Sequence, residues 1–453
     1  MDQLTPEAFV SPINHGSLSE QSGKWVCQKS GAKFPLIAGV PCLLPDADRA
    51  LIEWRMRAQG LIQHYEKAIA DLKEELRAPS LRTSTRSRLE KTRAMTIAHV
   101  EFLRATFEPL KLNQKGAQPS AEALGYKLPP SQAIQGYFPN LIRDWASESG
   151  ENEAGFLLLK EAWGESYAER TLVLGAGACR LAFDLHSSGL SKQTVCADLN
   201  PLLFLVARRI LAGETLKLVH FPTAPKNNEA ASGVLRVAKA PKATRTEGFS
   251  QVFADVYYLP FADESVDTVV TPWLIDILPQ RFEYLVQEIN RVLKPGGTWI
   301  NSGSLNFTLR RWSDSVSPEE AIEIASENGF KQEMFFQRAV PYLHTAEDAH
   351  QRTETVTTFR LKKTHKAPLS QQAPLSPEWL ADISVAIPKE MTDQNEVAFF
   401  DSQAFLIAHI DGKRSAKDLA LLLSQRYGLA ADESLDAVVS FLSRRASTRA
   451  FRS

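Results

Sequence analysis

One segment, residues 172–182, constrains the fold of this 453-residue chain more than any other. It reads Leu-Val-Leu-Gly-Ala-Gly-Ala-Cys-Arg-Leu-Ala, an apolar strand that runs through two glycines into a helix. Gly175 and Gly177 permit a tight turn and a close approach of the backbone to a ligand, and the helix start offers free N–H groups. The segment therefore predicts a ligand-binding turn in an α/β fold.

Further apolar runs alternate with helical patterns between about residues 136 and 363, and this alternation predicts a mostly parallel sheet. The strand-like runs are residues 171–174, 194–197, 252–254, 266–271 and 298–301. A polar stretch rich in lysine and arginine, residues 223–248, interrupts the pattern and is expected to be a surface insertion.

Acidic residues follow the next two strands. Asp198 lies 21 residues after Gly177, where its carboxylate could accept hydrogen bonds from ribose hydroxyls. Residues 253–267 resemble the methyltransferase segment that places an acidic residue, here Asp255, against the adenine amino group. A Lys-Pro-Gly-Gly turn at residues 294–297 also matches this class. The ordered set predicts a Rossmann-like class I methyltransferase that uses S-adenosylmethionine.

Two alternatives concern the glycines. A nicotinamide dinucleotide site requires a third glycine so that the helix packs close to the strand, whereas this chain has Ala178, Cys179 and Arg180 there. The glycines could also form a turn in an α/β domain that binds no ligand.

Four motifs make the resemblance more specific, because they match the carnosine N-methyltransferase-like family over about residues 136–363. They read Ile-Arg-Asp-Trp-Ala-Ser-Glu at 142–148, Val-Leu-Gly-Ala-Gly at 173–177 followed by Arg-Leu-Ala at 180–182, Trp-Leu-Ile-Asp at 273–276, and Leu-Lys-Pro-Gly-Gly-Thr-Trp-Ile-Asn-Ser-Gly-Ser-Leu at 293–305. The resemblance implies a seven-stranded, mostly parallel sheet and methyl transfer to an imidazole nitrogen.

The resemblance also implies roles for individual residues. The expected cofactor-binding residues are Arg143, Trp145, Gly175, Gly177, Arg180, Asp198, Leu199, Asp255, Val256 and Thr271. The expected substrate-binding residues are Trp273, Asp276, Asn301 and Phe307. Asp276 is the catalytic candidate, because a carboxylate that accepts the imidazole N–H fixes the tautomer whose lone pair attacks. The alternative is a carboxylate that only stabilises the start of a helix.

The chain departs from the family beside the substrate. Residues 277–280 read Ile-Leu-Pro-Gln where the family has a Thr-Ala-His-Asn-like run, and residues 306–308 lack a family histidine. We therefore expect a histidine-derived small molecule, such as the thiohistidine of ovothiol biosynthesis, or a carnosine-like compound. Two alternatives are a methyltransferase that modifies peptides and a catalytically silent partner subunit that binds cofactor. The oligomeric state is left open.

Distinct segments flank the methyltransferase domain, which is expected at residues 131–364. Residues 1–45 resemble a Trm112-type zinc ribbon, whose ligands are two Cys-x-x-Cys pairs. Here Ser11 and Asn14 replace the first pair, and the second pair keeps Cys27 but has Ser30 in place of its other cysteine, so we expect no zinc. Residues 46–130 predict two antiparallel helices and a linker. A second linker is expected at 365–385, and residues 386–453 resemble a PqqD-like winged-helix domain in which Ser415 caps a helix.

Composition excludes several partners. The formal net charge of −1 and the absence of any apolar run of about 18 residues argue against nucleic-acid and membrane binding and favour a cytoplasmic protein. The four cysteines form no Cys-x-x-Cys pair, which predicts reduced thiols and no metal site.

Overall fold

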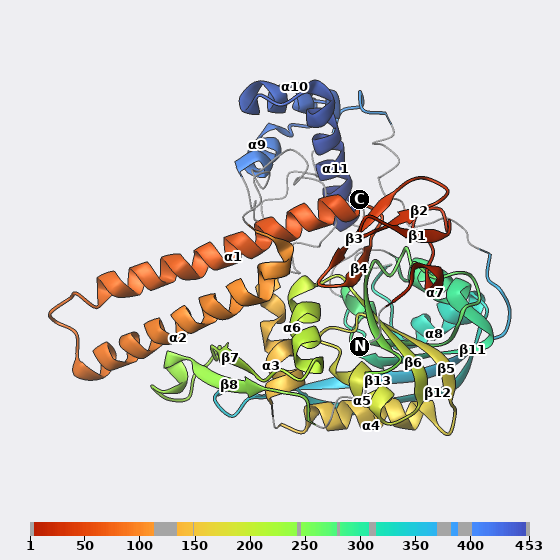
Figure 1. The fold of residues 1–453 in the computed structure, drawn as a ribbon, viewed down its shortest axis with the longest axis horizontal. Helices are drawn as coiled ribbons and strands as arrows, with labels where there is room; N and C mark the ends of the chain where they lie inside the picture. Colours follow the sequence, from red (N-terminus) through yellow and green to blue (C-terminus); the bar gives the residue numbers. More distant parts are fainter. Residues whose placement is uncertain are drawn as a thin grey trace.

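The computed structural model describes residues 4–112, 134–147, 149–241, 246–278, 281–307, 314–368, 382–387 and 401–449. The linker expected between the second predicted helix and the methyltransferase domain lies outside these residues, as does most of the linker expected at 365–385. An α/β body carries a projecting helical hairpin and a separate group of C-terminal helices (Figure 1). Among the described residues, no helix combines the length and apolarity needed to cross a bilayer.

One sheet of eleven strands forms the centre of the molecule, in the order β1-β2-β3-β4-β9-β6-β5-β10-β11-β13-β12. Its central strands are β9 (Phe249–Ala254), β6 (Ser191–Asp198), β5 (Ala168–Leu174), β10 (Val266–Pro272) and β11 (Leu293–Gly303), all parallel. At one edge, β13 (Arg352–Lys363) runs antiparallel to β11 and to β12 (Phe330–Tyr342). These seven strands confirm the expected α/β class.

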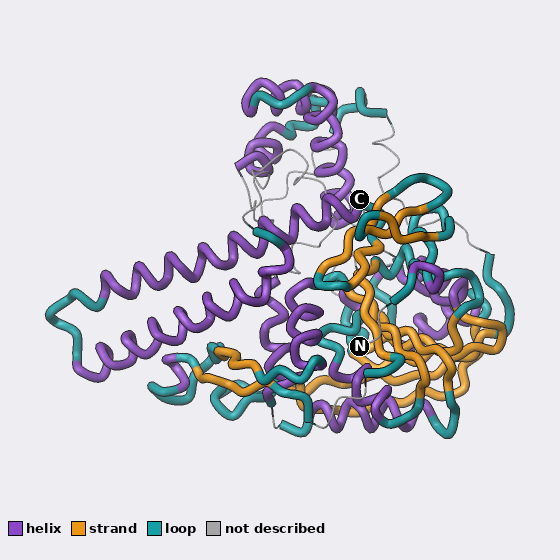
Figure 2. Tube along the Cα trace, viewed as in Figure 1, coloured by secondary structure: helices purple, strands orange, loops and turns teal. Residues whose placement is uncertain are grey.

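Helices cover both faces of the sheet (Figure 2). From β5 the chain winds outward through α5 (Arg180–Ser187) and α6 (Pro201–Leu211), and from β10 it winds the other way through α7 (Phe282–Val292) and α8 (Pro318–Glu327). Because such crossovers are right-handed, the two pairs lie on opposite faces. Helix α4 (Glu151–Trp163) packs beside α5. Burial on both faces explains the continuous apolar runs of the central strands.

The N-terminal segment corrects the expected strand count. Strands β1 (Leu18–Gln21), β2 (Lys24–Cys27), β3 (Lys33–Ile37) and β4 (Val40–Leu43) form an antiparallel meander, preceded by the 3-10 helix η1 (Pro6–Ala8). Strand β4 then pairs parallel to β9, with Cys42 opposite Phe253. The sheet thus has four strands more than the seven expected, because the meander supplies backbone groups that satisfy the edge of β9.

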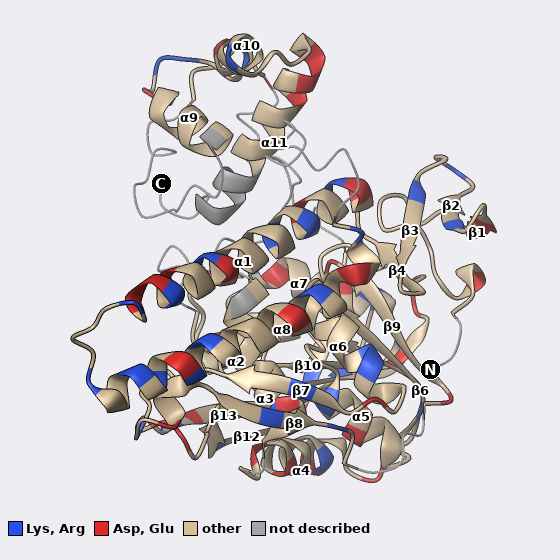
Figure 3. Cartoon of the chain, turned by 60° about the vertical axis from the view of Figure 1, so that its left-hand side comes forward, with Lys and Arg blue, Asp and Glu red and all other residues tan. Residues whose placement is uncertain are grey.

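Helices α1 (Ala47–Glu75) and α2 (Thr83–Phe107), followed by η2 (Glu108–Leu110), form the antiparallel hairpin that extends from the body. The base of the hairpin is buried: the ring of Trp54 lies 5.0 Å from that of Phe253. Lysines, arginines and acidic residues are interspersed along both helices (Figure 3). The side of the hairpin seen in this view therefore carries charges of both signs.

Two further parts complete the structure. Strands β7 (Leu216–His220) and β8 (Val234–Ala238), with η5 (Ala230–Ser232) between them, form a small antiparallel sheet, so the expected surface insertion contains a strand. The C-terminal helices α9 (Asp401–His409), α10 (Ala416–Tyr427) and α11 (Ala431–Arg449) have their own apolar core. Ser415 caps α10, as predicted.

Candidate active site

A cavity of about 170 Å³ opens at the carboxyl ends of the central strands. It lies where the strand order reverses between β5 and β10, the position at which open α/β sheets bind ligands. The 3-10 helix η4 (Ile134–Tyr137), α3 (Phe138–Ala146) and the start of α4 supply the remaining wall. Eight predicted site residues line the cavity, namely Arg143, Gly175, Gly177, Asp198, Leu199, Asp255, Val256 and Trp273.

Two glycines of the loop after β5 adopt the left-handed conformation, at the position where the sequence predicts a tight turn. Gly175 has φ of +62° and Gly177 has φ of +56°. A Cβ atom at Gly175 would lie 2.6 Å from Cδ1 of Leu274, so only glycine fits there without a shift of that side chain. The backbone N–H of Gly177 donates to Oδ2 of Asp198 at 2.8 Å, which fixes the loop against the end of β6.

Asp198 is both a support of this loop and an acceptor in the cavity. Its Oδ1 accepts a hydrogen bond from the backbone N–H of Asn200 at 2.8 Å, and Asn200 in turn caps α6. Burial raises the pKa of Asp198 to about 6, against the opposing effect of the backbone N–H groups of Asn200, Gly177 and Leu199. The carboxylate thus lines the cavity at the end of β6, and its role in binding a ribose stays a prediction.

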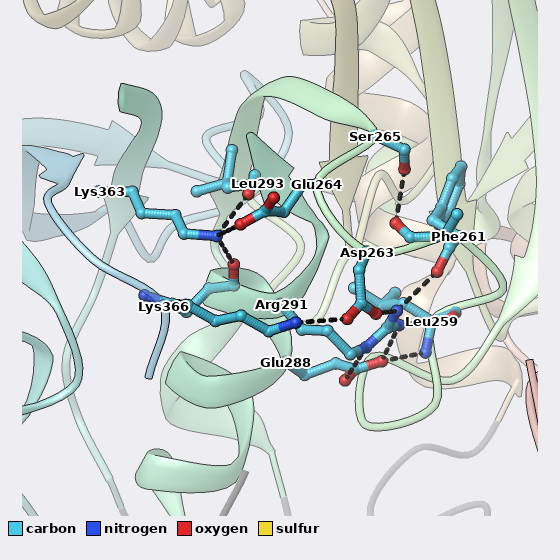
Figure 4. A network of polar contacts seen from close by, with 12 residues as sticks. Leu259, Phe261, Asp263, Glu264, Ser265, Glu288, Arg291, Leu293, Lys363 and Lys366 are labelled. Atoms are coloured by element: carbon cyan, nitrogen blue, oxygen red, sulfur yellow. Dashed lines mark hydrogen bonds and ion pairs between the residues drawn. The ribbon is translucent and has the colours of Figure 1, made fainter. Parts of the chain in front are cut away.

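A buried ion pair on α7 holds the loop that follows β9 and carries Asp255 (Figure 4). The side chain of Arg291 is 1% exposed, and its Nη2 lies 2.7 Å from Oε1 of Glu288. Arg291 also donates to the carbonyl oxygens of Leu259 and Phe261, at 2.9 and 2.7 Å. The hydrogen bonds of Arg291 therefore hold this loop against α7.

Six predicted site residues do not line the cavity. Nε1 of Trp145 donates to the carbonyl of Ala178 at 2.9 Å, and Arg180 donates to the carbonyl of Asp144 at 2.8 Å. These two side chains connect α3 to the glycine loop. Thr271 and Asn301 are hydrogen-bonded to each other within the sheet, at 3.0 Å. Their ligand-binding roles stay predictions.

The predicted substrate residues are divided between the cavity and its surroundings. Trp273 lines the cavity, and its ring lies 4.8 Å from that of Tyr342. Asp276 lies in η6 (Ile275–Ile277), and its Oδ2 accepts hydrogen bonds from Oγ of Ser304 at 2.6 Å and the N–H of Asn306 at 3.0 Å. The buried Phe307 packs near Phe282 instead of lining the cavity.

Sequence reasoning missed the wall contributed by η4, α3 and α4. Tyr137, Asn140, Glu151, Asn152 and Leu158 line the cavity from these elements. Asn140 is the one with a local signal, because it precedes Arg143 by three residues and so shares its helix face. Glu151, Asn152 and Leu158 are brought to the cavity by packing of α4 on the sheet, and Tyr137 comes from η4.

The four positions predicted to replace the zinc ligands of a ribbon, Ser11, Asn14, Cys27 and Ser30, lie around one thiol in the N-terminal segment. Sγ of Cys27 donates to Oδ1 of Asn14 at 3.4 Å. Burial raises the pKa of Cys27, but hydrogen bonds with Ser30 and Ser11 outweigh it and lower the pKa below its ordinary value. Among the described residues, no cluster of three histidine, cysteine, aspartate or glutamate side chains could hold a metal.

The strand order, the glycine loop and the carboxylates at the ends of β6 and β9 define a Rossmann-like methyltransferase, the class whose cofactor is S-adenosylmethionine. The residues present fit this cofactor, because Gly177 leaves open space beside Asp198. A family model for carnosine N-methyltransferase matches residues 130–365, just over half of the chain, and the chain belongs to this family.

Similar proteins include the carnosine N-methyltransferase of Dictyostelium discoideum, which is 27% identical over 200 residues. The match covers 39% of this chain and 42% of that protein, so the chain matches less than half of the relative's length. Among solved structures, N-methyltransferase NodS from Bradyrhizobium japonicum WM9 is 16% identical over 48% of this chain and 99% of its own, with a TM-score of 0.33. A complex between the Haloferax volcanii Trm112 methyltransferase activator and a putative methyltransferase also matches, at 17% identity over 51% of this chain and 98% of that one, with a TM-score of 0.34.

Proposed function

We propose that this chain transfers the methyl group of S-adenosylmethionine to a ring nitrogen of an imidazole in a histidine-derived small molecule. The match of residues 130–365 to the carnosine N-methyltransferase family carries the proposal. The cavity supports it, because the glycine loop, Asp198 and Trp273, whose ring packs on Tyr342, line the same cavity wall. Cofactor and acceptor could therefore meet in the same enclosed space.

The bound cofactor supplies an electrophilic methyl group on a sulfonium. The protein's task is then to align the attacking nitrogen and to exclude water, since methyl transfer is a direct displacement. The neutral imidazole has one N–H and one lone pair, so a carboxylate that accepts the N–H directs the lone pair. In this proposal Asp276 does so, with its Oδ2 held by Ser304 and Asn306.

The cavity wall favours a compact acceptor such as thiohistidine over carnosine. Ile277 and Leu278 line the cavity at the positions where the chain departs from its family. Apolar side chains cannot hydrogen-bond the peptide group of a dipeptide, and an unpaired buried peptide group is costly. Pro279, Gln280 and Thr308, which also depart from the family, lie outside the described residues.

Mass spectrometry of the purified chain with S-adenosylmethionine and a panel of acceptors tests the proposal. The panel contains histidine, thiohistidine, carnosine and short histidine peptides. We expect the gain of one methyl group on the imidazole of a small molecule. Methylation of peptides alone would indicate a peptide-modifying enzyme, and cofactor binding without any methylation would indicate a silent partner subunit.

Replacing Asp276 by Asn separates the catalytic role from a structural one. The amide keeps an acceptor for Ser304 or Asn306 but loses the charge, so we expect turnover to fall by about tenfold to a hundredfold. Affinity for S-adenosylhomocysteine should stay within about twofold, because Asp276 does not line the cavity beside the glycine loop. Normal turnover would leave Asp276 with the structural role.

A further inference from the structure

Two oppositely charged side chains, which the proposed function does not use, line the cavity from α3 and α4. Arg143 lies near the end of α3, and Glu151 is the first residue of α4. Both line the cavity, and their side chains are 15% and 5% exposed. The gap between Nε of Arg143 and Oε1 of Glu151 is 3.8 Å, which is too long for a hydrogen bond.

Both groups have buried hydrogen-bonding atoms left over. Nη1 of Arg143 is buried and makes no hydrogen bond within the described part of the chain. Both carboxylate oxygens of Glu151 are also buried, with the backbone of His344 and Leu343 beside them but no described charged side chain within hydrogen-bond distance. Nε of Arg143, in contrast, lies 2.7 Å from Oδ1 of Asp144, which holds the guanidinium in place. A buried charge without a close charged partner is costly. These atoms are therefore better explained as a binding site for a ligand than as a structural ion pair.

The apolar surroundings strengthen the electrostatic interactions of both charged groups. Leu158, Val340 and Val356 line the same cavity as Glu151 and pack together, and Trp273 packs against them. Burial raises the pKa of Glu151, while Arg143 and the nearby backbone of His344 and Leu343 oppose this increase. In such a setting of low dielectric constant, a charged hydrogen bond from a ligand is worth more than at the surface.

An arginine with an unused donor beside a buried carboxylate matches an α-amino acid group. One carbon separates the ammonium nitrogen from the carboxylate carbon in such a group, a distance of about 2.5 Å. The carboxylate of the ligand can pair with Nη1 of Arg143 while its ammonium group donates to Glu151. Each buried charge then has a partner of opposite charge within hydrogen-bond distance. A neutral or singly charged ligand would satisfy one side and leave the other unpaired.

We propose that Glu151 binds the ammonium group of a ligand's α-amino acid moiety, whose carboxylate pairs with Arg143. The inference deepens the proposed function and rests on it. Two ligands present this chemistry in a methyl transfer to histidine derivatives: the methionine portion of the cofactor, and the amino acid portion of the acceptor. The same variant distinguishes them.

Isothermal titration calorimetry of the full chain and its Glu151→Gln variant tests the proposal with four probes. S-adenosylhomocysteine carries the amino acid group, and 5′-methylthioadenosine lacks it. L-histidine carries the ammonium group, and imidazole-propionate lacks it. Glu161→Gln, at an exposed position of the same helix that pairs with Arg338, is the matched control.

If the cofactor is the source, E151Q binds S-adenosylhomocysteine about tenfold to a hundredfold more weakly and 5′-methylthioadenosine unchanged. If the acceptor is the source, E151Q loses the preference of the wild type for L-histidine over imidazole-propionate. Unchanged binding of 5′-methylthioadenosine also shows that E151Q is folded. The proposal would be overturned if E151Q bound both S-adenosylhomocysteine and L-histidine as tightly as wild type does. It would also be overturned if S-adenosylhomocysteine binding were equal and neither protein bound L-histidine. The readout is binding, so this failure is distinct from a failure to methylate.

Discussion

Asp198 shows how one residue links the local structure to the chemistry. Its two carboxylate oxygens accept hydrogen bonds from the backbone of Gly177 and Asn200, so the glycine loop and the start of α6 depend on it. The same group faces the cavity, where burial raises its pKa to about 6. The charge of this residue should therefore change near pH 6.

Cofactor affinity should fall as the pH decreases through about 6. In its predicted role the ionised carboxylate of Asp198 accepts hydrogen bonds from ribose hydroxyls, and protonation would remove part of this capacity. Affinity for S-adenosylhomocysteine, measured by calorimetry between about pH 8 and pH 5, should be full above the pKa of Asp198. Below that pKa it should decrease by at most about tenfold per pH unit.

Protonation does not unfold the protein through this residue. The folded-state pKa of Asp198 lies above its ordinary value, so the cost of burying its charge is relieved as the pH falls. Asp198→Asn is the control: its affinity should be lower than that of wild type and independent of this titration. A wild-type affinity that stays constant down to about pH 5 would remove Asp198 from the ribose role.

At the scale of elements, α7 connects the two halves of the sheet. Its Arg291 holds the loop after β9, and Nζ of Lys363 from β13 donates to the backbone carbonyls of Asn290 and Leu293, at 2.8 and 2.7 Å. The position of Asp255 thus depends on a helix from the opposite half of the fold. Loss of this connection should affect stability and cofactor binding together.

Replacing Arg291 by Leu should lower the free energy of unfolding by about 3 kcal/mol, because Glu288 is left buried without its partner. Urea denaturation measures this change, and calorimetry with S-adenosylhomocysteine should show weaker binding because the loop of Asp255 loses its support. Lys366→Ala is the matched control, since it removes an exposed partner of Asp263 in the same network. If the two variants were equally stable, the buried pair would not hold the loop.

At the scale of the whole molecule, the two flanking parts relate to the body differently. The N-terminal strands join the central sheet through β4 and share its apolar core, which includes Trp25 and Phe34. The C-terminal helices have a core of their own, and Arg49 of α1 donates to Ser440 of α11. The N-terminal part is therefore integral to the catalytic body, whereas the C-terminal part is a separate unit.

A chain that ends at residue 368 should fold and bind S-adenosylhomocysteine with the affinity of the full chain. A chain that begins at residue 46 should aggregate or melt at a much lower temperature, since it exposes the edge of β9 and half of its neighbouring core. Thermal denaturation and calorimetry of both truncated chains check this contrast. Weaker cofactor binding by the chain that ends at residue 368 would assign the C-terminal helices a part in the site.

The sequence alone predicted the parts of the fold that are local. The glycine loop, the central strands and the acidic residues after them follow from residues close in the chain, because strand ends and tight turns depend on local conformation. The order of these signals also predicted the class and the family. The helix cap at Ser415 is local for the same reason.

The tertiary structure decided which distant groups meet. Pairing of β4 with β9 depends on a contact across some two hundred residues, and no local pattern encodes the partner of an edge strand. Packing also gave Trp145 a hydrogen bond to the glycine loop and Asp276 one from Ser304, which their motifs did not predict. Glu151 came to the cavity because α4 packs against the far strands of the sheet. A side chain's direction is set by what packs around it, and that information is spread over the whole chain.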